Sequence, residues 1–203
     1  MNLYIMDIVI IILVFILFLC ASKKKEGFRG RRFHTTKESL RKLFSERAMW
    51  MKIFIEDNLQ DKSDKLHIQA RLYKNTADVK KYMLKVSKKK NVVYKFARML
   101  KKRSDLLISM IYQIQTQNKS DIIVSIDAVN QHSDMLAKFM ANHSKGTLTP
   151  QKIRHHLTKQ NKYIYNMTNT HFIADHASEV SEYDRFYTHM LKLSDLLNII
   201  IHT

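Results

Sequence analysis

The chain has 203 residues with 35 Lys and Arg, 18 Asp and Glu, 3 Gly, 1 Pro and 1 Cys, and its formal net charge is +17. This length holds one domain with a buried core, and the scarcity of Gly and Pro favours long helices over a turn-rich sheet. The single cysteine, Cys20, excludes an intrachain disulfide, so we expect an all-α domain that needs no oxidising compartment.

The first predicted element is a transmembrane helix at residues 3–21, within an anchor that we assign to residues 1–22. Its sequence, LYIMDIVIIILVFILFLCA, is nineteen residues long, and its one acid, Asp7, lies close enough to the end to reach the headgroups. The alternative is a cleaved signal peptide, but no Lys or Arg precedes the run and no A-x-A site follows it. We therefore expect a retained anchor in a single-pass membrane protein, with a short N-terminus across the membrane.

A basic juxtamembrane linker at residues 23–35 follows the anchor. Positively charged flanks stay on the cytoplasmic side, and the N-terminal flank has no basic side chain, so we expect the domain at residues 36–203 on the cytoplasmic side. The basic side chains of the linker are also candidates for contact with anionic lipid headgroups. They are Lys23, Lys24, Lys25, Arg29, Arg31 and Arg32.

The positive charge is confined to the first half of the chain. Residues 22–104 carry 26 Lys and Arg against 8 Asp and Glu, whereas residues 105–203 carry 9 of each class. A basic half can meet lipid headgroups or nucleic acid phosphates, or it can be a solvated surface. Nucleic acid is possible as a partner but not favoured, because no zinc finger, RRM or helix-turn-helix signature is present.

Six helices are expected in the domain at residues 36–203. Thr35 and Glu38 form a capping box before a helix at 36–57, and Thr149 with Pro150 opens another at 150–173. Polar breaks separate the remaining helices, which include those at 64–87 and 91–117. Because short connections favour antiparallel neighbours, we predict an antiparallel bundle of about six helices, arranged as three helical hairpins.

Three of these helices share a polar residue at the centre of an apolar stripe. Arg47 has this place at 36–57, and Arg103 and Gln160 have it at 91–117 and 150–173, at displacements of 56 and 57 residues. Their recurrence at one phase supports the three-hairpin arrangement. The partner helices of the first two units align at the same displacement, which matches Ile68, Leu72, Asn75 and Val79 with Val124, Ala128, Gln131 and Met135.

The central polar residues need partners inside the bundle. An unpaired buried charge is costly, so we expect each arginine to meet an acid or several carbonyl oxygens, and the available acids are Asp78, Asp184 and Asp195. Two interpretations stay open: the arginines reach the rim or form ion pairs that fix the register of the bundle, or they line an anion pocket. The predicted buried polar core consists of Arg47, Arg103, Gln160, Arg71, Asn75 and Asp78.

The sequence contains no motif of catalysis or metal binding. CxxC, HExxH and paired Cys/His spacings are missing, and three glycines do not build a phosphate-binding loop. The histidines, His171 and His176 among them, are interpreted as surface or helix-end residues. We therefore predict no cofactor, no metal site and no enzymatic activity.

Three groups of landmark residues follow one another from Leu40 onward: LFSER at 43–47 with Trp50 and Lys52, RLYKN at 71–75 with Asp78, and Tyr183-Asp184 with His189 and Asp195. Their order resembles a little-characterised helical-bundle family of secreted bacterial proteins and nucleocytoplasmic large DNA viruses. In the bacterial members, histidines that could bind a metal stand at the three central positions, so the resemblance implies that this possibility is lost here. The anchor and the Lys/Asn/Ile-rich composition resemble the viral branch.

The resemblance implies a structural role. In such viruses an internal membrane lies beneath an icosahedral capsid, and short single-span proteins link the two. We expect a structural membrane protein of the virion whose partners are the lipid bilayer and capsid or minor capsid proteins. The alternative is a membrane-tethered module that binds an anionic ligand or nucleic acid through its basic half. Candidates either for contact with a protein partner or for the core are Tyr163, Tyr165, Phe172 and Phe186.

Overall fold

The computed structural model describes residues 35–60 and 64–202. Within these ranges the chain forms α-helices and no strand, which confirms the expected all-α fold. The helices are α2 (Thr36–Leu59), α3 (Lys65–Val86), α4 (Lys90–Thr116), α5 (Lys119–Asn142), α6 (Pro150–Phe172) and α7 (His176–His202).

The membrane predictions fall on a different part of the chain. None of the six described helices combines the length and the apolar character needed to cross a membrane. The predicted anchor at residues 3–21 lies outside the described residues. So do the predicted lipid-contacting side chains Lys23, Lys24, Lys25, Arg29, Arg31 and Arg32.

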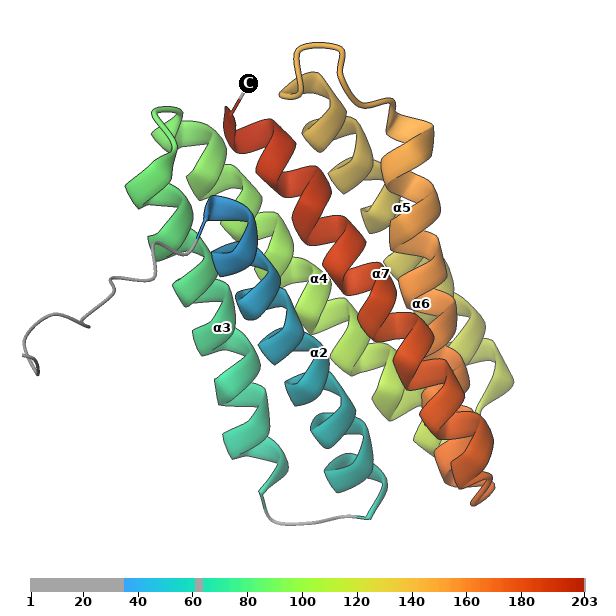
Figure 1. Ribbon diagram of the computed structural model, residues 1–203. Coiled ribbons are helices and arrows are strands. Elements are labelled where there is room, and N and C mark those ends of the chain that lie inside the picture. The colour runs from blue at the N-terminus through green and yellow to red at the C-terminus, as the bar shows by residue number, and fades with distance from the viewer. Residues whose placement is uncertain (1–34, 61–63, 203) are drawn as a thin grey trace, which may run out of the picture. The chain divides into compact units, whose positions relative to one another are not determined.

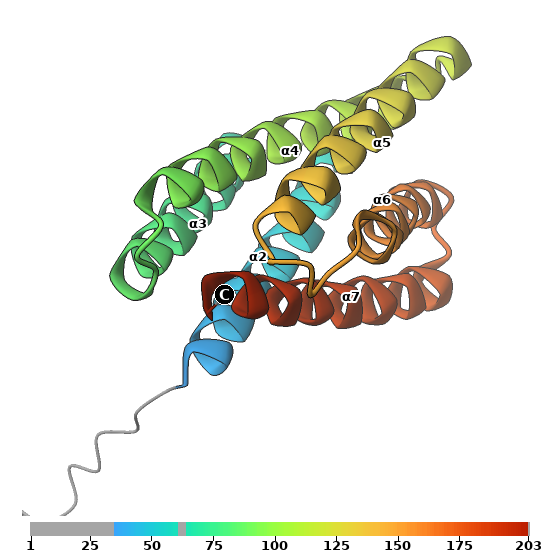
Figure 2. The ribbon, with the colours of Figure 1, turned by 90° about the horizontal axis from the view of Figure 1, so that it is seen from above.

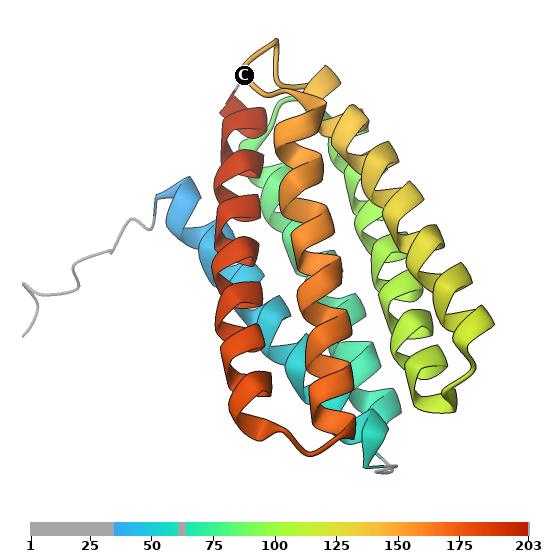
Figure 3. The same cartoon turned by 90° about the vertical axis from the view of Figure 1, so that its right-hand side faces the viewer.

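Consecutive helices are antiparallel. In Figure 1, α2, α4 and α6 run down the view and α3, α5 and α7 run up it. The hairpins α2–α3, α4–α5 and α6–α7 pack side by side, and α7 closes the ring against α2, while α2, α4 and α6 also contact one another through the centre. Seen from above, α3 lies on the side of the bundle away from α6 (Figure 2), and from the side α6 lies between α5 and α7 (Figure 3). The predicted antiparallel bundle is thus the architecture of this part of the chain.

Local sequence sets the helix starts. The Thr35 hydroxyl accepts a hydrogen bond from the Glu38 backbone N–H at 3.2 Å, and the Glu38 carboxylate accepts one from the Thr35 N–H at 2.8 Å. At α6, the Thr149 hydroxyl accepts from the Lys152 N–H at 3.2 Å, and Pro150 begins the helix. These caps satisfy N–H groups that have no partner within the helix. Because caps are local, the predicted and observed boundaries agree within two residues.

Apolar side chains from every helix form one core. Full burial of a Leu, Ile, Met or Phe side chain contributes about 1.5–3 kcal/mol, so this core is the main source of the bundle's stability. Its fully buried members include Leu40, Phe44, Phe54, Leu72, Leu100, Ile111, Leu136, Leu157, Ile164 and Leu197.

The predicted alignment of the two outer helices is wrong by one residue. Val124 and Met135 on α5, which were matched to core positions of α3, are 68% and 60% exposed. The residues of α5 that pack inward are their neighbours, such as Val129 and Leu136, which correspond to Leu72 and one later core position at a displacement of 57. Successive residues on a helix are rotated by about 100°. An alignment that is shifted by one residue therefore assigns to the core a set of residues that faces solvent.

We expect Gln117→Gly to stabilise the bundle. Gln117 ends α4 in the left-handed conformation, with φ 60° and ψ 10°, where a Cβ is unfavourable and glycine is not. The expected gain in the free energy of unfolding is about 0.5–1 kcal/mol, measured by urea unfolding of the full chain in mild detergent. Thr116→Gly, one residue earlier and still helical, is the control and should cost about 1 kcal/mol. A loss of stability in Gln117→Gly would contradict this reading of the turn.

Candidate functional site

The three central polar residues meet on the axis of the bundle. Arg47, Arg103 and Gln160 are 4%, 3% and 1% exposed. Together with apolar side chains from α2, α4 and α7, they surround a cavity of about 10 Å³. A cavity of that size holds one water molecule at most. The centre therefore has no room for a phosphate or a carboxylate. The interpretation of the arginines as a pocket for such an anion is thus excluded.

The Arg47 guanidinium joins the first hairpin to the second. Its Nη1 donates to the Thr76 hydroxyl at 3.0 Å and to the Asn75 side-chain oxygen at 3.4 Å, both on α3. Its Nη2 donates to the Ser104 hydroxyl and to the Leu100 carbonyl oxygen, both on α4. Two helices are thus fixed against α2 by one side chain.

Arg103 repeats this arrangement one hairpin further along the chain. Its Nη1 donates to the Ser133 hydroxyl on α5 at 2.8 Å. Its Nη2 donates to three oxygens on α6: that of the Asn161 side chain at 2.7 Å, the Leu157 carbonyl at 3.2 Å and the Gln160 side chain at 3.3 Å. Gln160 then donates from Nε2 to the His189 carbonyl on α7 at 3.1 Å. The three central side chains therefore link all three hairpins in series.

Of the two kinds of partner expected for the central arginines, the described residues supply neutral oxygens and not the candidate acids. In residues 35–60 and 64–202, neither guanidinium has a carboxylate within ion-pairing distance. Asp195 bonds the guanidinium of Arg41 at 2.7 Å instead. Asp78 lies 3.8 Å from Lys74 near the surface, and Asp184 is exposed. Hydroxyl, amide and carbonyl oxygens take the place of acids.

The polar row predicted on α3 is only partly buried. Asn75 lies inside, where its Nδ2 donates to the Leu43 carbonyl at 2.8 Å. Arg71 is exposed, with its guanidinium carbon 4.7 Å from the centroid of the Trp50 ring, and Asp78 is half-buried. These two residues flank the apolar face, where a charged group reaches water at little cost, so they stay outside the network.

The central arginines are charged in spite of their burial. Burial lowers the pKa of Arg47 to about 10. Burial also lowers the pKa of Arg103 to about 9, and the nearby positive charge of Arg47 adds to this effect. Both values lie above neutral pH, so two like charges share the core with neutral acceptors only. Two buried like charges contribute little to the free energy of unfolding. They do favour the one register of the helices in which every guanidinium N–H has an oxygen acceptor.

Asn75 and Gln160 were predicted as members of this network, but its other side-chain acceptors were missed in the sequence. Ser104 and Asn161 directly follow the central residues Arg103 and Gln160, and Ser133 and Thr76 lie on the outer helices. A polar residue directly after two of the three central residues, Arg103 and Gln160, was the available signal. Such residues are common on helices, so the signal acquires meaning only once the packing is known.

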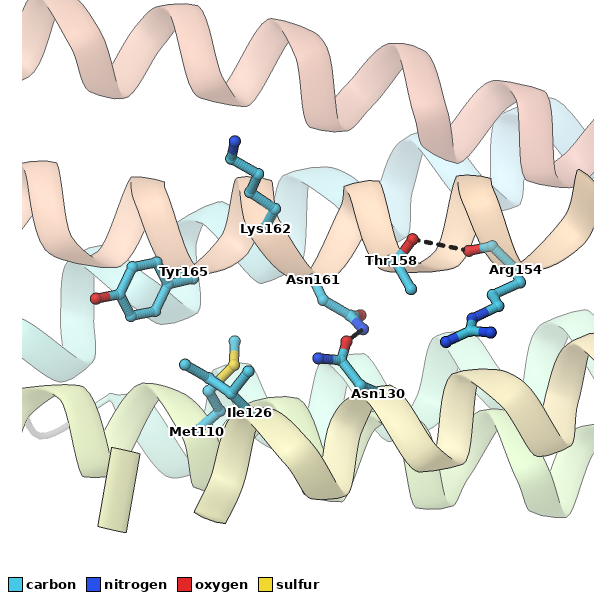
Figure 4. A pocket seen from close by; sticks show the side chains of 8 residues that line it. All are labelled: Met110, Ile126, Asn130, Arg154, Thr158, Asn161, Lys162 and Tyr165. Carbon is cyan, nitrogen blue, oxygen red and sulfur yellow. Dashed lines mark hydrogen bonds between the residues drawn. The ribbon is translucent and has the colours of Figure 1, made fainter. Parts of the chain in front are cut away.

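A surface groove of about 340 Å³ opens beside the arginine core, between α5 and α6. Asn161, which accepts from Arg103, also donates from Nδ2 to the Asn130 side-chain oxygen at 2.9 Å, and both line the groove (Figure 4). Arg154, another lining residue, lies 2.7 Å from a carboxylate oxygen of Asp134. A substitution at Arg103 can therefore alter this groove through the hydrogen-bonded side chains of Asn161 and Asn130.

The basic half of the chain forms a face along α3 and α4. Residues 65–102 contain 13 Lys and Arg against one acid, Asp78. These residues lie along the whole of α3 but only on the first half of α4, on either side of the α3–α4 turn (Figure 1). The contact of this basic half with lipid headgroups stays a prediction.

A groove of about 480 Å³ lies within this face, between α3 and α4. We call it the tyrosine groove. Lys101 Nζ is 4.6 Å from the centroid of the Tyr73 ring, and Lys80 Nζ is 5.7 Å from that of Tyr94, which is half exposed. Exposed aromatic rings beside cations can stack on bases while the cations meet phosphates. The residues that define the groove are Tyr73, Thr76, Ala77, Lys80, Tyr94, Ala97, Arg98 and Lys101.

A pair of histidines joins α6 to α7 beside Gln160. The Nδ1 atoms of His156 and His189 lie 3.3 Å apart. Burial lowers the pKa of His189 to about 4, and the like charges of His156 and Lys192 add to it. Burial and the neighbouring His155 also lower the pKa of His156. Both imidazoles are therefore neutral at neutral pH.

Acid should destabilise the bundle through His189. Between pH 6.5 and about 4 the unfolded chain binds a proton at this residue that the folded chain does not, so stability falls as the pH falls through this window. Allowing for solvent screening, the loss should be about 1–2 kcal/mol. Urea unfolding of the full chain at about pH 7 and about pH 4 measures it. His189→Gln should reduce this loss and His67→Gln, at an exposed site, should not; equal losses in both would contradict the assignment.

The fold and its centre define a class: an antiparallel six-helix bundle whose hairpins are tied in series by buried arginines. No family model matches the chain, and neither the curated proteins nor the solved structures include a significantly similar one. The resemblance to the viral and bacterial family therefore stays a prediction.

Proposed function

We propose that this protein is a structural membrane protein of a large DNA virus particle. The segment at residues 3–21 anchors it in the internal membrane, and the bundle contacts capsid or minor capsid proteins. The observation that carries the proposal is the closed centre. The most unusual polar residues of the chain are used to hold the hairpins together, around a cavity of about 10 Å³.

The ends of the bundle suit a link between a membrane and a protein shell. The start of α2, which follows the predicted anchor and linker in sequence, lies at the same end of the bundle as the α3–α4 turn (Figure 1). The lysines at 88–90 at that turn suit anionic headgroups. The α6–α7 turn lies at the other end. There Phe172, Ile173 and Val180 are 45%, 63% and 55% exposed, and we call these three residues the apolar tip. Exposed apolar clusters are typical of protein interfaces.

The candidate contact residues predicted from the sequence differ in their exposure to solvent. Phe186 is 2% exposed and belongs to the core. Tyr163 and Tyr165 are half-buried against it. Only Phe172 is available to a partner, as part of the apolar tip.

Detergent stripping of purified particles tests the proposal. The protein should be present at a fixed copy number and should leave with the membrane or stay with the shell. Replacing the apolar tip by Phe172→Asp, Ile173→Asp and Val180→Asp should release the shell while membrane insertion persists. Met135→Asp, 60% exposed on α5, is the matched control and should keep both contacts. Absence from particles, with normal particles after deletion of the gene, would refute the structural role.

A second function is favoured by the tyrosine groove: a membrane-tethered module that binds an anionic ligand or nucleic acid. Its cations and exposed ring are suited to a phosphate chain that carries flat bases. Salt distinguishes the two functions. Binding to phosphates should weaken steeply as the salt concentration rises, whereas a packed protein interface should change less.

A further inference from the structure

The turn between α6 and α7 brings together three metal-ligating side chains. His171 lies in the last turn of α6, and His176 and Glu179 lie in the first turn of α7. The Nδ1 atoms of His171 and His176 lie 3.0 Å and 3.3 Å from the same Glu179 oxygen, Oε2. All three possible ligand atoms lie within 4.8 Å of one another.

The Glu179 carboxylate is buried and incompletely satisfied. The residue is 4% exposed, and its Oε1 has no hydrogen-bond partner. The nearest cation to that oxygen is Lys52, whose Nζ is 3.8 Å away, outside hydrogen-bonding distance. Glu179 thus has the two histidine nitrogens at Oε2 and an ion pair with Lys52, but its Oε1 still lacks a hydrogen-bond donor, which is costly for a buried carboxylate oxygen.

The turn itself is firmly held. The Ala174 N–H donates to the His171 carbonyl at 3.1 Å, and the Asp175 N–H donates to the Thr170 carbonyl at 2.9 Å. The Asp175 side chain then accepts from the Ser178 N–H at 3.1 Å. These bonds fix the end of α6 against the start of α7, so the three ligands are positioned before any ion arrives.

The geometry fits a small divalent transition metal. Bond lengths of about 2.0–2.2 Å to zinc place two ligand atoms of a tetrahedron about 3.3–3.5 Å apart, close to the separations between Glu179 and the two histidines. Two imidazoles and one carboxylate are a ligand set that zinc accepts, with a fourth position left for water. The side chain of His176 is 71% exposed, which gives an ion access from solvent, whereas those of His171 and Glu179 are 11% and 5% exposed.

We propose that His171, His176 and Glu179 form a zinc-binding site that joins α6 to α7. This inference goes beyond the proposed function and does not depend on it. The ion would neutralise the buried carboxylate and tie the two helices at the end of the bundle that carries the apolar tip. The sequence pattern H-x4-H-x2-E crosses a turn, which is why a search for ligand pairs on one helix overlooks it.

Metal titration of the full chain in mild detergent, purified without a histidine tag, tests the site. Zinc is titrated in competition with a chromophoric chelator, and cobalt, which absorbs visible light in a site of low coordination number, replaces it in a parallel measurement. We expect one ion per chain. His176→Ala should weaken binding about 100-fold, as for loss of one of three ligands, and its exposed position keeps the fold intact.

Two further variants sharpen the result. Glu179→Gln keeps the shape of the side chain but removes its charge, so it should abolish the visible cobalt spectrum and the rise in Tm that zinc produces in the natural chain. The double variant His156→Ala with His189→Ala removes the other histidine cluster and should bind zinc as tightly as the natural chain. No binding by the natural chain would overturn the site. So would zinc affinity that survives His176→Ala or falls in the double variant.

Discussion

Gln160→Arg should destabilise the bundle by about 3–5 kcal/mol, the range for an uncompensated buried charge. The Gln160 oxygen lies 3.3 Å from Arg103 Nη2, so the substitution places a third guanidinium against the two already present. The central cavity of about 10 Å³ offers no space for a longer side chain. Urea unfolding of the full chain in mild detergent measures the change. Gln151→Arg, at an exposed position of the same helix, should stay within about 0.5 kcal/mol of the natural chain.

Gln160→Glu should have the opposite sign. The side chain keeps its shape and supplies the carboxylate that the arginine centre lacks, although it loses the 3.1 Å hydrogen bond to the His189 carbonyl. That bond contributes about 1 kcal/mol, and two buried guanidiniums beside a carboxylate should return more, for a net gain of about 1–2 kcal/mol. The guanidiniums should lower the pKa of the new carboxyl group in the folded chain. The gain should therefore be present at neutral pH and disappear as the pH falls through that lowered pKa. A variant no more stable than Gln160→Arg would contradict the picture of a charge-deficient core.

The centre of the bundle could be predicted because its signal is local. Arg47, Arg103 and Gln160 stand at one phase of three apolar stripes, and an apolar stripe on a helix must face the core. The helix starts could be predicted for the same reason, since the caps at Thr35 and Thr149 are built from neighbours in sequence. Features that depend only on residues close together in sequence can be predicted without the tertiary structure.

The partners of those residues could not be predicted because they depend on tertiary register. The acceptors of Arg103 lie 30 to 58 residues away, on α5 and α6. A shift of one residue in α5 would replace Ser133 by a neighbour that faces elsewhere, and the sequence alignment of the outer helices made that shift. The sequence also left open whether an acid or several oxygens would meet each guanidinium, because several neutral oxygens satisfy a guanidinium as well as a carboxylate does.

The basic half shows a further limit of the sequence. Net charge by segment places the positive residues in the first half of the chain, but the antiparallel helices distribute them between the two ends of the bundle. The tyrosine groove forms because Tyr73 and Lys101, or Lys80 and Tyr94, meet across two helices. Such pairing between α3 and α4 decides whether the charge is scattered or concentrated, and spacing along the chain does not reveal it.

The second prediction with a large expected effect concerns the tyrosine groove. Reversing three of its charges by Lys80→Glu, Arg98→Glu and Lys101→Glu should weaken binding of a labelled single-stranded oligonucleotide about 100-fold at low salt, if the groove holds the phosphate chain. Fluorescence anisotropy of the full chain in nanodiscs of zwitterionic lipid measures the affinity without competition from anionic headgroups. The slope of log affinity against log salt should become shallower by about 2, the value for three lost phosphate contacts on a single strand.

A matched variant separates the groove from the overall charge. Lys152→Glu, Lys159→Glu and Lys162→Glu change the net charge by the same amount on α6, which lies on the side of the bundle away from α3 (Figure 2). If the groove is the site, this variant should lose far less affinity and keep the natural salt slope. Tyr94→Ala should cost about 1–3 kcal/mol of binding, since it removes the exposed ring on which a base can stack. Equal losses in both charge-reversed variants, with no effect of Tyr94→Ala, would show that the basic face is a solvated surface, and would leave the structural role in the virion as the better account of the molecule.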